Sequence, residues 1–397
     1  MFRHATAVLC AAVSLSAMQT STKQIINVGP APVGPYSPAV KAGGLIYLSG
    51  TLSQDDAGAI TGADVASQTR RVIDRMKTVL EASGSSLPQV VAVTVYLRSA
   101  GDFAAMNDAY RAYWPKDPPT RTTVITDLLL GALVEVSMIA VPNGAERVVV
   151  HPKDWIASPN PYSYAIRTGD TLFLSGLVPR NGRDNSVVAG DITVQTKAVL
   201  DNAGELLRAA GMDHSNIVSG RIYLPDGADF QAMNAAYREY FKQNPPARAT
   251  VIAGLAGKGY AVEMTFVASS SPRQVVGNAT NPNLSPAIRA GNRLYVSGVL
   301  GNTADNAGNA GAQTKETLSR IRATLEAGGY TPADVVDSLV YLTDLSKFQE
   351  MNGAYRGFFE KAPSTGSGPS FPARATVGTG LVSPGGVVEI MVTAVKQ

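Results

Sequence analysis

Cysteine and histidine are almost absent from this chain of 397 residues, which has one cysteine, Cys10, and three histidines. Cys10 and His4 lie in an N-terminal segment that we expect to be removed, so the mature chain would have no thiol, disulfide or cysteine-bound metal. His151 and His214 stand in no metal-ligand spacing. These shortages exclude a histidine-based triad and a zinc site, so the chemistry must use arginine, carboxylate, hydroxyl, amide and water.

A surplus of charge of one sign is missing as well. The 34 lysines and arginines against 31 aspartates and glutamates give a formal net charge of +3. With 45% hydrophobic and 16% charged residues, the composition is that of a globular protein and not of a disordered one. Nucleic-acid binders carry a basic surplus against phosphates, so no nucleic-acid partner is expected.

Long apolar runs are also lacking. The longest at the N-terminus, Ala5 to Ala17, is shorter than the roughly 20 residues of a membrane span. It follows a short basic start and ends in small residues, a pattern typical of a secretory signal peptide. We expect residues 1–20 to be such a peptide, and the mature protein to be secreted or periplasmic without a membrane partner. A retained helical anchor is the alternative.

Repetition is what the chain has in abundance. The strand P-P-T-R-T-T-V around Arg121 recurs as P-P-A-R-A-T-V around Arg248 and F-P-A-R-A-T-V around Arg374, at intervals of 127 and 126 residues. Each arginine is followed 14 or 15 residues later by a glutamate in an apolar strand; these are Glu135, Glu263 and Glu389. A fixed period of this length defines three units. We place them at residues 24–146, 147–271 and 272–397.

The other motifs of each unit follow one order. Two β-rich runs ending in Ser-Gly predict a hairpin, and a helix opened by Gln-Thr and closed by glycine comes next, with Gln68, Gln195 and Gln313 at its start. A β-branched strand, the motif F-x-x-M-N-x-x-Y, the arginine strand and the glutamate strand complete the unit. The order is β-β-α-β-α-β-β, which predicts an α+β fold with helices on one face of a sheet.

The motif F-x-x-M-N-x-x-Y leaves one residue open. Its phenylalanine, methionine and tyrosine recur at helical spacing, which is most simply a helix face packed on the sheet. The asparagine next to the methionine fits either a helix-end hydrogen bond or a functional site. The three asparagines are Asn107, Asn234 and Asn352.

Taken together, G-P-Y-S-P, the strand ending in Ser-Gly, F-x-x-M-N, P-x-R-x-x-V and V-E-V resemble the Rid family, the reactive intermediate deaminases also called the YjgF family. The resemblance implies chorismate-mutase-like domains that assemble as trimers around a central β-barrel, with clefts between adjacent subunits. We therefore expect three tandem Rid/YjgF-type domains forming an intramolecular pseudo-trimer, active as a monomer. Closure would also hide the sheet edges.

The resemblance further implies hydrolysis of 2-imino acids and their enamine tautomers to 2-keto acids and ammonia, without a metal or an organic cofactor. In that comparison Arg121, Arg248 and Arg374 bind the substrate carboxylate, and the glutamates of the repeat position water. The remaining matching cleft residues are Tyr36, Tyr162, Ser49, Gly50, Ser175, Gly176, Ser297, Gly298, Asn107, Asn234 and Asn352.

Elementary chemistry agrees with these roles. A guanidinium is a planar, permanently charged fork that a carboxylate fills with two hydrogen bonds. An iminium carbon is already electrophilic, so holding it beside a water and moving one proton suffices. The alternative for each arginine and glutamate of a unit is an internal salt bridge that ties adjacent strands together.

Two departures from the family pattern set expectations about the individual clefts. Leu284 stands where the tyrosine is expected, and an additional loop, Pro363–Pro369, could reshape the third cleft. We therefore favour the clefts that contain Arg121 and Arg248. Two other functions stay open: a protein that captures small carboxylates without turnover, and an endoribonuclease, against which the near-neutral charge and the missing histidine pair weigh.

Overall fold

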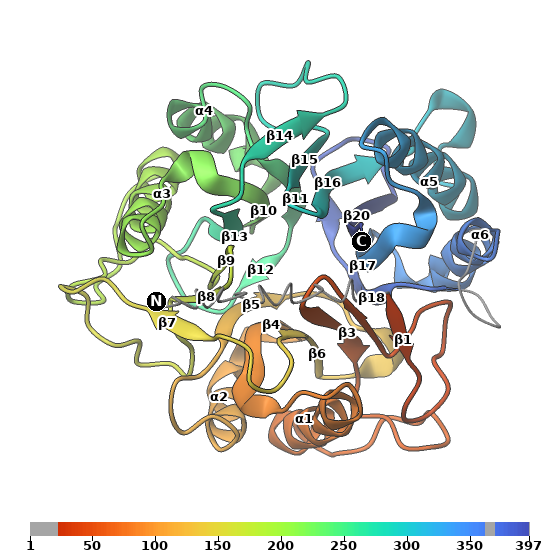
Figure 1. Cartoon of the computed structure of the whole chain (residues 1–397), viewed down its shortest axis with the longest axis horizontal. Coiled ribbons are helices and arrows are strands. Elements are labelled where there is room, and N and C mark those ends of the chain that lie inside the picture. The colour runs from red at the N-terminus through yellow and green to blue at the C-terminus, as the bar shows by residue number, and fades with distance from the viewer. Residues whose placement is uncertain (1–22, 362–369, 397) are drawn as a thin grey trace, which may run out of the picture.

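The structure, a computed structural model, describes residues 23–361 and 370–396. Three units of similar shape surround a common centre, with their helices on the outside and their strands facing inward (Figure 1). The predicted signal peptide and the Pro363–Pro369 loop lie outside the described residues. Within the described ranges no helix is long and apolar enough to cross a membrane.

Each unit contributes a hairpin with one extra leading strand, a long helix, a strand, a shorter helix, the arginine strand and the glutamate strand. The first unit consists of β1 (Gln24–Ile26), β2 (Ala39–Ala42), β3 (Leu45–Thr51), α1 (Val65–Ala82), β4 (Val90–Leu97), α2 (Phe103–Arg111), β5 (Thr120–Ile125) and β6 (Val134–Ala140).

The second and third units repeat this order and add a two-residue strand after the arginine strand. The second consists of β7 (Val148–Val150), β8 (Ala165–Thr168), β9 (Thr171–Leu174), α3 (Ile192–Ala209), β10 (Ile217–Leu224), α4 (Phe230–Tyr240), β11 (Ala247–Ile252), β12 (Gly254–Leu255) and β13 (Glu263–Ser269). The third consists of β14 (Arg273–Val276), β15 (Ala287–Ala290), β16 (Arg293–Leu300), α5 (Ala310–Ala327), β17 (Val335–Leu342), α6 (Phe348–Phe359), β18 (Ala373–Gly378), β19 (Gly380–Leu381) and β20 (Val388–Val395).

One mixed sheet forms the inner layer of each unit. In the first unit its order is β1-β2-β3-β6-β4-β5. Strands β4 and β5 run parallel because α2 connects them, whereas the other neighbours are antiparallel. The predicted α+β class and the three tandem units are confirmed.

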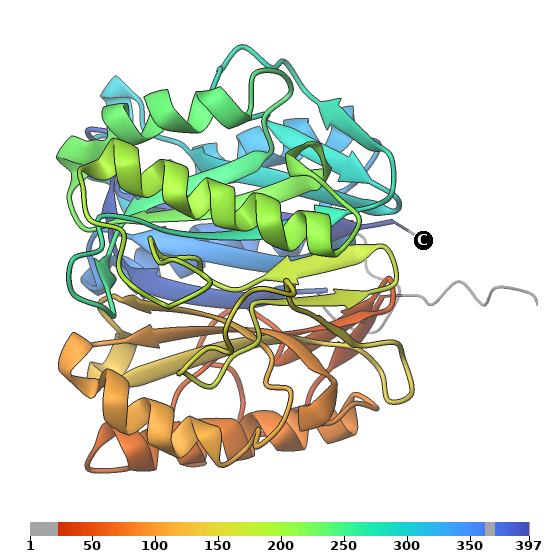
Figure 2. The same ribbon diagram turned by 90° about the vertical axis from the view of Figure 1, so that its left-hand side faces the viewer.

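The helices cover the outer face of the sheets (Figure 2). In α1 the buried stripe includes Val72, Ile73, Met76 and Leu80, spaced for one helix face. The long helices begin three residues before the predicted Gln-Thr pairs, because an acidic or amide side chain caps each of them. In α1 the cap is Asp64, whose Oδ1 accepts a hydrogen bond from the Ser67 amide at 2.7 Å.

A shared core joins the three units at the centre. Tyr96, Tyr223 and Tyr341 occupy the same position of β4, β10 and β17 and are fully buried, and the hydroxyl oxygens of Tyr223 and Tyr341 lie 3.5 Å apart. Apolar side chains of all three arginine strands pack in the same cluster. The units thus bury their inner faces against one another, as expected for a pseudo-trimer.

The predicted central barrel is not closed. The strands form three separate sheets. In the described part of the chain, the strand pairings between neighbouring units are short: β12 with β5, β19 with β11, and a single bridge between Asp127 and Gly378. The ladder stops because part of each arginine strand is hydrogen-bonded by side chains of the next unit, as described below.

Arg293 of β16 contacts all three units. Its Nη1 lies 3.5 Å from Oδ1 of Asp170 and 3.4 Å from Oγ1 of Thr171, both in the second unit, and its Nη2 donates to the carbonyl of Gly43 in the first. The residue is 8% exposed. Arg293 therefore connects the units at the end of the molecule where their hairpins meet.

Replacing Arg293 with methionine should destabilise the fold, because it leaves the Gly43 carbonyl and Asp170 without their partner. We expect the free energy of unfolding in urea to fall by about 1–3 kcal/mol. The control is Arg289→Met, on the exposed face of β15, which should change it by less than about 0.5 kcal/mol. Equal effects of the two substitutions would contradict this role of Arg293.

Candidate functional site

Three clefts lie where the arginine strand of one unit meets the hairpin of the next. The amide of Arg121 donates to Oγ of Ser175, that of Arg248 to Oγ of Ser297, and that of Arg374 to Oγ of Ser49, at 2.9, 2.8 and 2.8 Å. We name each cleft after its arginine. The third unit therefore closes the circle onto the first.

The glutamate of each cleft comes from the same unit as the serine. Glu263 and Arg121 line one cavity, and Glu135 and Arg374 line another. Oε1 of Glu263 also accepts a hydrogen bond from the Thr123 amide, at 3.3 Å. In these two cavities the arginine therefore meets a glutamate of another unit, and not the glutamate that follows it in its own unit.

The alternative of an internal salt bridge is wrong. Within residues 23–361 and 370–396, none of the three arginines forms an ion pair with any carboxylate. Arg121, Arg248 and Arg374 are nevertheless only 3%, 2% and 3% exposed. A buried cation without a counter-charge is costly, and this arrangement suits a site that receives an anion.

An asparagine and a tyrosine of its own unit hold each arginine. Nη2 donates to Oδ1 of Asn107, Asn234 or Asn352, at 2.6, 2.7 and 2.8 Å. This answers the question left open by the sequence, because each asparagine orients an arginine. The guanidinium carbon lies 4.8, 4.7 and 4.7 Å from the ring centres of Tyr110, Tyr237 and Tyr355, within cation–π range.

The serines lock the arginine strands in place. Besides accepting from the arginine amide, the hydroxyls of Ser49, Ser175 and Ser297 donate to the carbonyls of Ser37, Ser163 and Ser285, at 2.6, 2.7 and 2.6 Å. Both functions of the hydroxyl are thus used within the protein. The serine fixes the interface between units and has no second proton for a substrate.

The glycines after these serines make room for the glutamates. A Cβ atom on Gly50, Gly176 or Gly298 would overlap Oε1 of the glutamate in the same cleft. Glycine is therefore required by a close approach of carboxyl and backbone and not by an unusual backbone angle.

The tyrosines complete only two clefts. Tyr36 lies 5.3 Å from the guanidinium carbon of Arg374, and Tyr162 lies 5.8 Å from that of Arg121. Leu284 precedes Ser285, whose hydroxyl and amide bind the carbonyls of Pro245 and Pro246 at the start of the Arg248 strand. The missing tyrosine thus falls in the Arg248 cleft. The better-equipped clefts are those of Arg121 and Arg374, in place of Arg121 and Arg248.

Burial raises the pKa of Glu135, Glu263 and Glu389 to about 8, with the nearby arginines opposing the shift. Amides of the arginine strand oppose it as well in two clefts, Thr376 for Glu135 and Thr123 for Glu263. At neutral pH these groups are mostly neutral carboxylic acids that can donate a proton as well as accept one. Each cleft therefore combines a fixed cation with a poised acid.

Two further groups support the site through contacts that were not predicted from the sequence. The amide oxygens of Gln68, Gln195 and Gln313 accept hydrogen bonds from the backbone two residues before each glutamate, at 2.9, 2.7 and 2.9 Å. These glutamines position the glutamate strand and do not open the helix. The tyrosines under the guanidinium were expected to be core residues. The glutamines and the tyrosines recur in all three units of the sequence, but the groups that they contact lie in another part of the same unit.

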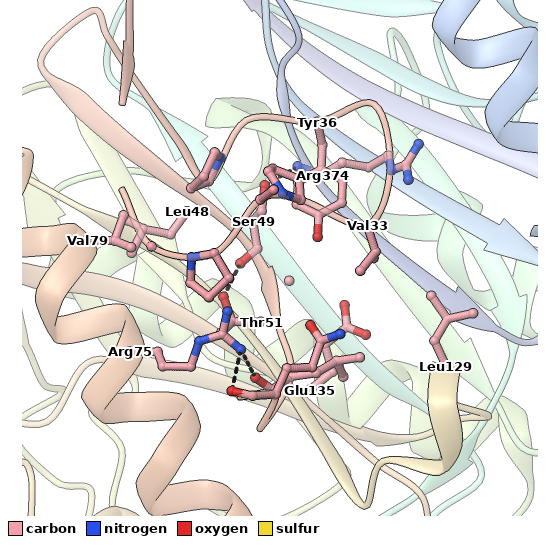
Figure 3. A pocket seen from close by; sticks show the side chains of 18 of the residues that line it. Val33, Tyr36, Leu48, Ser49, Thr51, Arg75, Val79, Leu129, Glu135 and Arg374 are labelled. Carbon is pink, nitrogen blue, oxygen red and sulfur yellow. Dashed lines mark hydrogen bonds between the residues drawn. The ribbon is translucent and has the colours of Figure 1, made fainter. Parts of the chain in front are cut away.

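Cavities open beside two of the arginines. The cavity of the Arg374 cleft measures about 250 Å³, and Val33, Leu48, Val79 and Leu129 supply its apolar wall (Figure 3). That of the Arg121 cleft measures about 100 Å³ and is bounded by Tyr162 and Tyr260. Both volumes suit small molecules.

Comparison with known proteins identifies a family. The family model described as endoribonuclease L-PSP matches residues 26–142, 153–270 and 278–396. A RutC family protein of Sulfurisphaera tokodaii is 43% identical over 109 residues, 28% of this chain and 87% of that protein. The human protein named 2-iminobutanoate/2-iminopropanoate deaminase is 37% identical over 112 residues, 28% of this chain and 82% of that protein.

Among solved structures, a chorismatase covers 77% of this chain and 93% of its own, with a TM-score of 0.53 and 16% sequence identity. At that identity the likeness concerns the fold alone. It spans more than one unit, whereas the relatives above match single units.

The raised pKa of the glutamates predicts a pH-dependent stability. In the folded protein Glu263 keeps its proton up to about pH 8, against an ordinary value of 4.5. The unfolded state therefore binds fewer protons in this window, and the stabilisation that is full below pH 4.5 is lost as the pH rises through 8. In urea unfolding, the free energy of unfolding should fall less between pH 4.5 and 8 in Glu263→Gln than in the wild type. The exposed Glu326→Gln is the control, and a slope in Glu263→Gln equal to the wild type would contradict the assignment.

Adding a methyl group at Gly176 should displace Glu263. We expect Gly176→Ala to lower the free energy of unfolding by about 1–3 kcal/mol, as for overpacking of a buried site. Gly353→Ala is the matched control, because a Cβ there meets no atom within 4 Å and alanine is the better helix former. A Gly176→Ala variant as stable as Gly353→Ala would show that the glutamate does not occupy this space.

Proposed function

Because the chain belongs to the endoribonuclease L-PSP family through all three of its units, we propose that it is a hydrolytic deaminase of 2-imino acids and their enamine tautomers. The products would be 2-oxo acids and ammonia. The observation that carries this proposal is a buried arginine that has no counter-charge among the described residues and faces a carboxyl group with a pKa of about 8.

The arginine binds the substrate carboxylate. Asparagine and tyrosine hold the guanidinium from its own unit, so its orientation is fixed before the substrate arrives. Burial lowers the pKa of Arg121 and Arg374 from the ordinary value of 12.5, which an incoming carboxylate would offset. Binding thus neutralises the charge that the empty cleft leaves unpaired.

The glutamate transfers the protons. Water adds to C2 of the imine, its oxygen forms the new bond, and one of its protons passes to the nitrogen. The remaining proton of the water, now on the hydroxyl group at C2, then moves to the nitrogen as the C2–N bond breaks, so that ammonia leaves and the oxygen becomes the carbonyl of the 2-oxo acid. A carboxyl group with a pKa near neutrality can give a proton to the nitrogen and take one from the water. No atom beyond one water is consumed.

The three clefts are not equivalent in this proposal. The Arg374 and Arg121 clefts have the tyrosine and a cavity, whereas Leu284 replaces the tyrosine at the Arg248 cleft. We expect the first two to account for most of the turnover.

The relatives support the reaction class, since one of them is named an imine deaminase. The family description points instead to RNA cleavage, but the net charge of +3 offers little attraction for phosphates. Export by the N-terminal segment is part of the proposal, and N-terminal sequencing of the secreted protein would test it.

Removing the arginines should abolish turnover of 2-iminobutyrate and 2-iminopropionate, generated in situ and followed by ammonia release. Arg121→Gln combined with Arg374→Gln should lower kcat/KM at least a hundredfold, since a charged bidentate contact is lost in both complete clefts. Arg248→Gln should lower it less than twofold.

The control is Arg208→Gln, on the exposed surface of α3. A folded wild type that does not accelerate either reaction would contradict the deaminase function. If it still bound 2-oxobutyrate, it would be a carboxylate-binding protein instead.

A further inference from the structure

The wall of the Arg374 cleft contains a second cation, Arg75 of α1 (Figure 3). Its Nη1 donates to the carbonyls of Leu52 and Gln54, at 2.8 and 3.2 Å. These bonds fix the guanidinium and leave Nε and Nη2, one complete edge of the fork, without a protein partner in the described part of the chain. Arg75 is half-buried and forms no ion pair there.

A third cation lies one helical turn away. Arg71, whose Nε is 3.4 Å from the carbonyl of Gln54, lines the same cavity. Asp56 is the acidic group at the rim, and it is exposed. With Glu135 held neutral by burial, the cavity keeps more positive charge than the carboxylate of a simple imino acid would offset.

The other two units do not have a free cation at the position of Arg75. The eleventh residue of the long helix is Arg75 in α1, Asn202 in α3 and Arg320 in α5. Arg320 makes the same bond to the strand, from Nη1 to the carbonyl of Leu300 at 2.8 Å, but its Nε is paired with Glu316 at 2.8 Å. Glu316 occupies the position of Arg71. The second unit has thus replaced the cation, and the third has neutralised it.

We propose that the Arg374 cleft recognises a dicarboxylate, a 2-imino or 2-oxo acid whose side chain ends in a second carboxylate, and that Arg75 binds this second group. The inference rests on the proposed function for the position of the first carboxylate, at Arg374. The free Nε–Nη2 edge of Arg75 matches a planar carboxylate with two parallel hydrogen bonds. The volume of about 250 Å³ leaves room for a side chain between the two arginines.

The Arg121 cleft differs in each respect. Its cavity is about 100 Å³, and the cation in its wall, Arg180, is already engaged. Arg180 donates to the hydroxyl of Tyr260 and, at 2.6 Å, to the carbonyl of Asn185, and its guanidinium lies 5.4 Å from the Tyr260 ring centre. This cleft therefore takes acids with short, uncharged side chains, and the two complete clefts divide the substrates between them.

Calorimetric titration of the full chain with 2-oxoglutarate and 2-oxobutyrate tests the proposal. The parent for this comparison carries Arg121→Gln and Arg248→Gln, so that only the Arg374 cleft binds carboxylates. We expect 2-oxoglutarate to bind at least tenfold more tightly than 2-oxobutyrate, the effect of one charge-assisted contact. Arg75→Asn, which introduces the residue of the second unit, should remove this preference.

Two further variants separate charge from packing. Arg71→Glu keeps Arg75 but recreates the pair of the third unit, so it should also remove the preference even if Arg75→Asn is poorly folded. Arg320→Asn, the same change in the third unit, should leave the preference intact. Equal affinities for the two acids in the parent, or a preference that survives Arg71→Glu in a folded protein, would overturn the proposal.

Turnover distinguishes this inference from the proposed function. Preferential binding of 2-oxoglutarate without turnover of any imine would support dicarboxylate recognition and contradict the deaminase function. Turnover of 2-iminobutyrate without any preference for the dicarboxylate would support the deaminase function and contradict dicarboxylate recognition.

Discussion

A buried arginine at each junction between units, which forms no ion pair with any residue that the structure describes, is the constraint on which the rest of the structure depends. Its guanidinium is held by an asparagine and a tyrosine of one unit, while its backbone is held by a serine of the next. An unpaired charge at such depth is tolerated only where other contacts fix it and where an anion can reach it. All three junctions meet the first condition, and the cavities beside Arg121 and Arg374 meet the second.

This constraint also explains why the central barrel stays open. If the sheets were joined by a continuous ladder, the edge of each arginine strand would be occupied by backbone. Instead a serine hydroxyl and a glutamate carboxyl bind part of that edge, and the space beside them becomes the cleft. The glycine after each serine leaves space for the glutamate. A glutamine of the long helix binds the backbone two residues before that glutamate and so holds its strand in place. Joining the units in one chain lets the three junctions diverge, as Leu284 and the helix positions of Arg75, Asn202 and Arg320 show.

Much of the fold could be predicted from the sequence, because three copies of one unit show which residues recur. The period of the Arg121 strand defined the units, and apolar spacing placed their helices and strands. The structure brings Arg121, Glu263, Ser175 and Asn107, which the resemblance named, together at one junction, but the sequence did not show which unit completes the cleft of each arginine. Sequence spacing relates residues within a unit, whereas the pairs form between units. The Gln-Thr motif was misread for a similar reason, since the backbone group that Gln195 binds lies 66 residues away.

The measurement that most directly tests this account is a crystal structure of the protein with 2-oxobutyrate bound. The account predicts the carboxylate on the guanidinium of Arg121 and of Arg374, with the oxo group turned toward Glu263 and Glu135 of the following unit. A ligand bound elsewhere, or an arginine paired with a glutamate of its own unit while the ligand is bound, would contradict it.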